Sequence, residues 1–260
     1  MIAKEKLNIL WSLEQTAEKY ADRVAVSDVN QELTWKELVK KAQVIGAELS
    51  EKVQPGNPVP VLLEKSSETL AVMLGIVYAG CFYVPVNPMN PTERLRKIME
   101  KLDPEVIISD EKGKEQLEAV GNGLENKVMG PEALKTATGT ELSEEQYSRL
   151  EQIQGQWKET DVLYGIFTSG STGTPKAIVV SHGAASRFIR HFTEIFEITS
   201  ADVIGNQAPF DFDVSVKDIY SSIMTGAQLV LIPKEYFSTP PRLLDYLCDK
   251  KVTNLTWAVS

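Results

Sequence analysis

Short apolar segments alternate along the chain with longer segments of helical spacing, and this alternation limits the possible folds more than any other feature. Amphipathic or apolar helical patterns lie at residues 34–49 and 69–79 and from Pro91 onward. The apolar segments are rich in valine, isoleucine and aromatic residues, as strands are, and lie at residues 24–26, 59–63, 82–86, 106–108 and 162–167. Strands that alternate with helices form βαβ units. The sequence therefore predicts an α/β fold with mostly parallel sheets flanked by helices.

A polar stretch divides this pattern. Residues 110–160 are rich in glycine, glutamate and lysine, and we interpret them as a surface excursion with some helix. A chain of 260 residues is long enough to bury a core on each side of it. We therefore expect two αβ subdomains, at residues 1–155 and 156–260. In the first, Thr34 and Glu37 have the spacing of a capping box and predict the start of a helix.

Composition and charge exclude several classes of function. The formal net charge of −9 and the lack of a long Lys/Arg run argue against a nucleic acid partner or an anionic membrane surface. No apolar stretch approaches the roughly 18 residues of a membrane span, and no signal-peptide pattern opens the sequence, so a cytoplasmic protein is expected. The cysteines, Cys81 and Cys248, are far apart in the sequence. They predict neither a disulfide framework nor a metal site, and we expect both to be small buried hydrophobic side chains.

The stretch from Phe167 to Lys176 carries the clearest chemical signal. Gly170 and Gly173 let backbone N–H groups approach a ligand closely, and Lys176 adds a positive charge. Further donors are the hydroxyl groups of Thr168, Ser169, Ser171 and Thr172. A Walker loop has its lysine directly after the second glycine and runs into a helix, whereas an apolar segment, residues 177–180, follows here. The pattern predicts a strand–loop–strand element that binds phosphate; a plain turn rich in Ser, Thr and Gly is the alternative.

This stretch resembles, nearly residue for residue, the phosphate-binding loop of the adenylate-forming (AMP-binding) superfamily. It departs from the family pattern at Phe167, where tyrosine is usual, and at Ala177, where the closing glycine would be. The second departure requires a negative φ at that position. The resemblance implies that the loop holds the β- and γ-phosphates of ATP, with Mg²⁺ offsetting the phosphate charge. It extends over about residues 20–260, since residues 33–38 and 77–86 also resemble motifs of the family.

A second group of residues, Phe210-Asp211-Phe212-Asp213, precedes a helical pattern that begins at Ser215. From the residues alone, Asp213 is either an N-terminal helix residue that binds free N–H groups, with Ser215 as a competing cap, or a binding residue. The family resemblance implies the latter. In members that activate amino acids, an aromatic–aspartate pair at the position of Phe212 and Asp213 binds the substrate's α-amino group. A buried ammonium group needs such a carboxylate partner.

Between these two groups lies a predicted helix with aromatic residues on one face. Phe188, Phe192 and Phe196 are spaced four apart, and we expect them to pack in the core rather than to stack on a nucleotide base. His182 is expected at the start of this helix in a structural role.

Within the superfamily, the chain looks most like the D-alanine–carrier protein ligases, with nonribosomal peptide synthetase adenylation domains second. This resemblance implies activation of an amino acid, D-alanine in those ligases, to an aminoacyl-adenylate with release of pyrophosphate. Transfer to the thiol of an acyl or peptidyl carrier protein would follow. An acyl-CoA synthetase is the alternative activity.

The family's adenine-binding and ribose-binding segments and its catalytic lysine would follow residue 260. No catalytic residue is therefore assigned, and we expect the 260-residue piece alone to be inactive. A non-catalytic binding module is the competing hypothesis.

Overall fold

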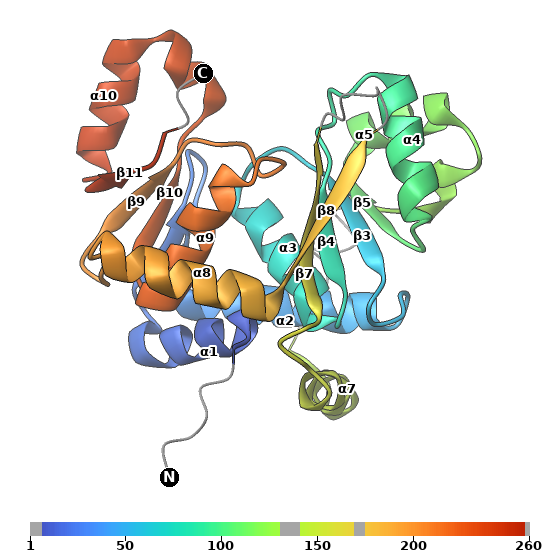
Figure 1. The fold of residues 1–260 in the computed structure, drawn as a ribbon, viewed down its shortest axis with the longest axis horizontal. Coiled ribbons are helices and arrows are strands. Elements are labelled where there is room, and N and C mark those ends of the chain that lie inside the picture. Colours follow the sequence, from blue (N-terminus) through green and yellow to red (C-terminus); the bar gives the residue numbers. More distant parts are fainter. Residues whose placement is uncertain (1–6, 131–140, 169–174, 258–260) are drawn as a thin grey trace. The chain divides into compact units, whose positions relative to one another are not determined.

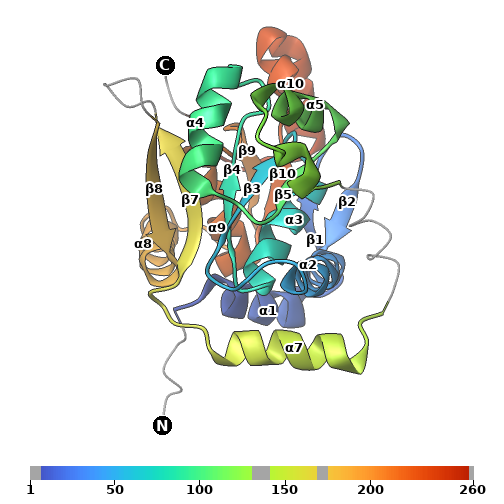
Figure 2. The same ribbon diagram turned by 90° about the vertical axis from the view of Figure 1, so that its right-hand side faces the viewer.

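The computed structural model describes residues 7–130, 141–168 and 175–257 and has an α/β fold (Figures 1 and 2). Its elements before residue 131 are α1 (Ile9–Tyr20), β1 (Val24–Ser27), β2 (Glu32–Thr34), α2 (Trp35–Ser50), β3 (Pro58–Leu62), α3 (Ser67–Tyr78), β4 (Phe82–Pro85), α4 (Thr92–Leu102), β5 (Ile107–Ser109), α5 (Glu111–Val120), the 3-10 helix η1 (Leu124–Lys127) and β6 (Val128–Met129). Those after residue 140 are α7 (Glu144–Gly155), β7 (Val162–Thr168), β8 (Lys176–Ser181), α8 (His182–Ile195), β9 (Val203–Asn206), α9 (Val214–Thr225), β10 (Gln228–Leu231), the 3-10 helix η2 (Lys234–Ser238), α10 (Pro240–Asp249) and β11 (Asn254–Leu255). The alternation of strands and helices that the sequence predicts is confirmed.

The chain folds into two compact units that are interleaved in sequence. The first unit comprises Met1–Val39, Lys65–Glu68 and Gly183–Ser260, and the second comprises Lys40–Glu64 and Thr69–His182. Among the described residues, a five-stranded sheet belongs to the first unit and a six-stranded sheet to the second. The boundary between residues 155 and 156 stays a prediction.

The sheet of the first unit has the strand order β11-β9-β10-β1-β2. β11, β9, β10 and β1 run parallel, and β2 pairs antiparallel with β1. Helix α9 packs on β9 and β10, and α1 packs on α9. Gly226 ends α9 with a φ of +79°, and a Cβ there would lie 2.5 Å from the Tyr20 ring. Both the left-handed backbone and the close approach of α1 therefore require glycine at this position.

The sheet of the second unit has the strand order β6-β5-β3-β4-β7-β8. Its strands run parallel except β8, which pairs antiparallel with β7. Helices α4 and α5 pack against each other and contribute to the apolar core of this unit. The buried members of that core are Leu62, Val84, Val86, Leu95, Ile98, Met99, Ile107, Leu117 and Leu124. The polar stretch 110–160 supplies α5, η1, the edge strand β6 and α7.

Helix α2 begins at the capping box that the sequence predicts. The Thr34 Oγ1 accepts a hydrogen bond from the Glu37 backbone N–H at 3.3 Å, and Glu37 Oε2 accepts one from the Thr34 N–H at 2.8 Å. Each side chain therefore satisfies a backbone donor that the first helical turn leaves without a partner.

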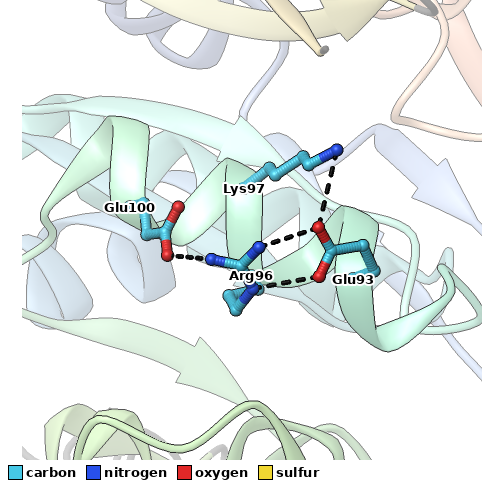
Figure 3. A network of polar contacts seen from close by, with 4 residues as sticks. All are labelled: Glu93, Arg96, Lys97 and Glu100. Carbon is cyan, nitrogen blue, oxygen red and sulfur yellow. Dashed lines mark hydrogen bonds and ion pairs between the residues drawn. The ribbon is translucent and has the colours of Figure 1, made fainter. Parts of the chain in front are cut away.

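Helix α4 carries a group of charged side chains on its surface, Glu93, Arg96, Lys97 and Glu100, which we call the α4 network (Figure 3). Arg96 donates to both carboxylate oxygens of Glu93, at 2.7 and 3.0 Å, and also pairs with Glu100. The Lys97 Nζ lies 3.5 Å from Glu93 Oε1. The hydrogen bonds from Arg96 lower the pKa of Glu93. Since all four side chains are at least 36% exposed, water screens these attractions.

Candidate functional site

The predicted strand–loop–strand element is present as the antiparallel hairpin of β7 and β8. Thr168 pairs with Lys176 at the end of the hairpin next to the connecting loop, and Phe167 pairs with Ala177. The residues between them that the sequence assigns to phosphate binding, Ser169, Gly170, Ser171, Thr172 and Gly173, lie outside the described residues. The strands on both sides of the loop are therefore confirmed.

Thr168 and Lys176 sit where the hairpin meets this loop. Directly opposed residues of an antiparallel pair point to the same face of the sheet, with Cβ atoms about 5 Å apart. Both side chains are exposed, so a hydroxyl donor and an ammonium group are accessible to an anion on one face. Ala177 lies in the β8 strand and is not among the residues with positive φ. Alanine at this position in place of glycine therefore causes no backbone strain.

Strand β7 holds the hairpin on the second unit. Leu163 and Ile166 are buried. The Tyr164 ring stacks on Tyr83 of the neighbouring strand β4, with ring centroids 5.9 Å apart and planes at 22°. The root of the hairpin is therefore set by packing within the sheet, while its end carries the polar groups.

His182 is the first residue of α8 and is buried. Its ring stacks on Trp157 at a centroid distance of 6.5 Å, and its backbone N–H donates to the Asp161 carbonyl at 3.0 Å. Burial lowers the pKa of His182 to about 4, so the imidazole is neutral at physiological pH. The position expected from the sequence, at the start of the helix, is confirmed, and a structural role stays a prediction that this burial supports.

Phe212 and Asp213 lie in the turn between β9 and α9. The backbone N–H of Phe212 donates to the Pro209 carbonyl at 3.1 Å, which closes the turn. The Phe212 side chain is 57% exposed, and Asp213 is exposed as well. Phe210 is buried and anchors the turn on the unit. The turn therefore presents an aromatic ring and a carboxylate at the surface of the first unit.

Asp213 occupies the N-cap position of α9 but does not act as a cap. Its φ and ψ are −61° and −25°, which is helical backbone, and its side chain makes no capping hydrogen bond in the described part of the chain. The hydroxyl group of Ser215, the competing cap, donates to the Phe212 carbonyl at 2.7 Å. A helix cap accepts a hydrogen bond from a backbone N–H of the first helical turn, and neither side chain is observed in that role. The Asp213 carboxylate is accessible to a ligand.

Three polar residues lie next to this turn and form a group that we call the Lys65 cluster: Lys65, Asn206 and Asp218. Asn206 and Asp218 are 0% and 2% exposed. The Asn206 Nδ2 donates to Asp218 Oδ2 at 2.9 Å, and Lys65 Nζ donates to the carbonyls of Asn206 and Gln207 at 3.1 and 3.0 Å. Sequence reasoning gave Lys65 no role, because a lysine between a strand and a helix carries no signal of a partner 141 residues away.

Burial shifts the pKa values of the two charged residues of the Lys65 cluster. Burial raises the pKa of Asp218 to about 7, against the opposing effects of the Asn206 hydrogen bond and of the Lys217 and Lys65 charges. Burial likewise lowers the pKa of Lys65 to about 8, although Asp218 and Glu235 attract its charge. Both groups therefore titrate near neutral pH.

Two expectations about apolar side chains are wrong. Phe188 and Phe196 on α8 are 52% and 59% exposed rather than packed in the core. Their rings contact Phe192 between them, at centroid distances of 6.0 and 4.6 Å. A four-residue spacing places side chains on one helix face but does not say whether that face is covered. Similarly, Cys81 is buried as expected, whereas Cys248 near the end of α10 is exposed.

In the part of the chain that the structure describes, no helix is both long and apolar enough to cross a bilayer. Among the same residues, no three His, Cys, Asp or Glu side chains come together as a possible metal site.

Residues 13–259 match the family of AMP-binding enzymes, and the chain belongs to this family. It is 30% identical over 244 residues to tyrocidine synthase 1 of Brevibacillus parabrevis, in an alignment that covers 94% of this chain and 21% of that protein. It is 30% identical over 236 residues to D-alanine–D-alanyl carrier protein ligase of Staphylococcus epidermidis, in an alignment that covers 90% of this chain and 44% of the ligase. The chain thus spans less than half the length of these relatives.

The fold is that of adenylation domains. The crystal structure of the nonribosomal peptide synthetase FmoA3 in its AMPPNP-bound form superposes with a TM-score of 0.79 and 25% identity, over 96% of this chain and 25% of that one. This likeness confirms the predicted adenylate-forming fold.

Proposed function

We propose that the intact native protein activates an amino acid with ATP. A carboxylate oxygen of the amino acid attacks the α-phosphorus, the bond from that phosphorus to the oxygen of the β-phosphate breaks, and pyrophosphate leaves. The product is an aminoacyl-adenylate. Membership of the AMP-binding enzyme family supports the nucleotide part of this reaction.

The β7–β8 hairpin is proposed to bind the β- and γ-phosphates. Thr168 and Lys176 would contribute a hydroxyl donor and a positive charge from the two strand ends. By their resemblance to the family loop, we assign the remaining contacts to Ser169, Gly170, Ser171, Thr172 and Gly173. An exposed hydroxyl opposite an exposed ammonium is a donor set that fits a phosphate chain.

Mg²⁺ would supply charge neutralisation of the phosphates when bound. Such an ion commonly takes most of its ligands from substrate phosphates and water, with only one or two from the protein. Among the described residues no three acidic, histidine or cysteine side chains are grouped, and the proposal assigns the ion no ligand from this part of the chain.

The amino acid part of the proposal rests on the exposure of the Asp213 carboxylate. This carboxylate is exposed at the start of α9 and makes no capping hydrogen bond with the described residues. A carboxylate in this state can pair with the substrate ammonium, and the neighbouring Phe212 can contact the substrate beside it. An acyl-CoA synthetase would gain nothing from such a carboxylate, because its acyl substrates carry no ammonium group.

The acceptor of the aminoacyl group is proposed to be the thiol of a carrier protein. The name of the S. epidermidis relative states that it joins D-alanine to a carrier protein, and D-alanine is therefore the first substrate to try. A peptide synthetase adenylation domain, supported by the likeness to FmoA3, would run the same first step with another amino acid. A cytoplasmic location, without a nucleic acid or membrane partner, belongs to this proposal.

Amino acid-dependent exchange of pyrophosphate into ATP by the intact native protein tests the proposal directly. D-alanine, the other common amino acids, and fatty and aryl acids would be compared at one concentration. Stimulation by a fatty or aryl acid but by no amino acid would contradict it.

Two variants assign the two halves of the site. Asp213→Asn keeps the size of the side chain and removes its charge, so kcat/KM for the amino acid should fall about 30- to 4,000-fold with little change in the KM for ATP. Lys176→Ala should chiefly raise the KM for ATP. If Asp213→Asn lowered the melting temperature and left activation near wild type, Asp213 would have a role in stability and not in amino acid binding.

A further inference from the structure

The turn that carries Phe212 and Asp213 is tied together at its two ends. Asn206 is the last residue of β9, before the turn, and Asp218 lies in α9, after it. The 2.9 Å hydrogen bond between their side chains joins the strand end to the helix across the turn, and both side chains are buried. A shift of α9 relative to β9 that is large enough to break this bond would displace the turn.

Lys65 holds the same turn from a distant part of the sequence. Its ammonium group donates to two consecutive carbonyls, those of Asn206 and Gln207, at the point where the chain leaves the sheet. The Asn206 carbonyl also accepts from the Ile232 N–H at 3.0 Å, as part of the pairing beside β10. The start of the turn is thus held both by the sheet and by a cation.

The backbone next to Lys65 is itself fixed. Asp28 Oδ2 accepts hydrogen bonds from the backbone N–H and the hydroxyl group of Ser67, at 2.9 and 2.7 Å. Gln31 Nε2 donates to Ser67 Oγ at 2.9 Å and to Glu68 Oε1 at 2.8 Å. Lys65 and these residues all belong to the first unit. The ammonium group therefore projects from an anchored segment rather than from a free loop.

We propose that Lys65, Asn206 and Asp218 are positioning residues for the amino acid: the Lys65 cluster sets where the turn places the Asp213 carboxylate. This inference rests on the proposed function of Asp213. A carboxylate must lie within hydrogen-bond distance of the substrate ammonium to pair with it, and small displacements of a binding group cost much of its effect.

The charge of Lys65 is part of this role. Asp218 and Glu235 are the charged groups that face it, and Lys65 and Lys217 are those that face Asp218. Lys65 loses its proton near pH 8, whereas arginine stays protonated over the whole accessible range. The Lys65→Arg variant should therefore keep amino acid activation and extend it to higher pH.

The test measures pyrophosphate exchange by the intact native protein, with D-alanine or whichever amino acid stimulates the wild type. Lys65→Met should lower kcat/KM for the amino acid at least tenfold and change the KM for ATP less than twofold, and Lys65→Arg should recover most of the loss. Asp218→Asn, which is nearly isosteric, should lower kcat/KM about threefold or more. Lys250→Met is the matched control, because it removes a lysine from a partly exposed ion pair in the same unit.

A double-mutant cycle separates positioning from stability alone. If Lys65 acts through Asp213, Lys65→Met should cost less than threefold in the Asp213→Asn background, although it costs at least tenfold in the wild type. Equal losses in both backgrounds would overturn the inference, as would a lowered melting temperature with unchanged kcat/KM in folded Lys65→Met or Asp218→Asn. Exchange that no amino acid stimulates in the wild type would instead refute the proposed function. Loss of activity in Asp213→Asn but not in the cluster variants would refute the positioning role alone.

Discussion

The α4 network and the Lys65 cluster contain the same kinds of charged group and behave in opposite ways. In the α4 network, Arg96 lowers the pKa of the Glu93 carboxyl group. In the Lys65 cluster, the pKa of the Asp218 carboxyl group is raised to about 7, although cations and a hydrogen bond oppose the rise. The α4 side chains are at least 36% exposed, whereas Asp218 is 2% exposed.

Solvent explains the difference. Water stabilises each charge of the α4 network. A nearby opposite charge therefore stabilises the charged form only a little more, and the loss of hydration on folding destabilises it only a little. Asp218 is buried away from water. The loss of hydration raises its pKa by more than the neighbouring hydrogen bond and cations lower it. The number of surface ion pairs is therefore a poor guide to the free energy of unfolding. A single buried carboxyl group, by contrast, makes that free energy sensitive to pH and to mutation of the residues around it.

Removing the cation of the Lys65 cluster should have the largest effect on stability. We expect Lys65→Met to lower the free energy of unfolding by about 2–4 kcal/mol, because Asp218 and two backbone carbonyls lose their donor or counter-charge. Since Lys65 is only partly buried, the upper end of the range for buried pairs is not expected. Urea unfolding at pH 7.5 measures the change. The double variant Lys65→Met/Asp218→Asn should recover at least half of it, and a loss below about 1 kcal/mol for the single variant would place the cluster with the surface pairs.

The pH dependence of stability should show the effect of the raised pKa of Asp218. Its folded pKa of about 7 lies above the ordinary value of 3.8. Below about pH 4 the carboxyl group is protonated in both the folded and unfolded states. Between about pH 4 and 7 only the folded state keeps the proton, so this group's contribution to stability is lost as the pH rises through that window.

We expect the resulting decline to be about 1–3 kcal/mol. Urea unfolding between pH 4 and 8 should show it in the wild type and not in Asp218→Asn. Asp245→Asn, at an exposed position of α10, should leave the slope unchanged. An identical slope in wild type and Asp218→Asn would show that folding does not change the protonation of this carboxyl group.

An ion pair of intermediate exposure should have a smaller effect. The Lys250 Nζ lies 2.8 Å from Glu32 Oε1, and the two side chains are 25% and 50% exposed. Lys250→Met should change the free energy of unfolding by less than about 1 kcal/mol. The same urea titration measures this value, and a change as large as that of Lys65→Met would contradict the argument from solvent.

The α4 network should have the smallest effect of all. Arg96→Gln removes the guanidinium group that joins Glu93 and Glu100, yet the melting temperature should stay within about 2 °C of the wild type. Adding salt should reduce even that difference, because screening weakens attractions between exposed charges. A larger shift that persists in high salt would mean that packing of the Arg96 stem, rather than its charge, stabilises α4.

Much of the fold follows from local patterns. Apolar segments alternating with helical spacing predict the strands and helices, Thr34 and Glu37 predict the start of α2, and the glycine-rich stretch predicts the β7–β8 hairpin. These features depend on residues a few positions apart, because the periods of helices and strands and the geometry of caps are local. The candidate site residues on the hairpin and at Phe212 and Asp213 were also found from the sequence, through residue types and their family resemblance.

The remaining features depend on residues that are distant in sequence. Strand β1 pairs with β10, so that Val26 lies beside Leu229, and Lys65 binds a turn 141 residues further along. Whether a helix face is covered, as for Phe188, or a carboxylate is enclosed, as for Asp218, depends on what other segments pack there. Sequence periodicity assigns side chains to a face, but only the packed tertiary structure determines how much water reaches that face. The exposure of Asp213 and the burial of Asp218, five positions apart on the same segment, were therefore decided by the tertiary structure.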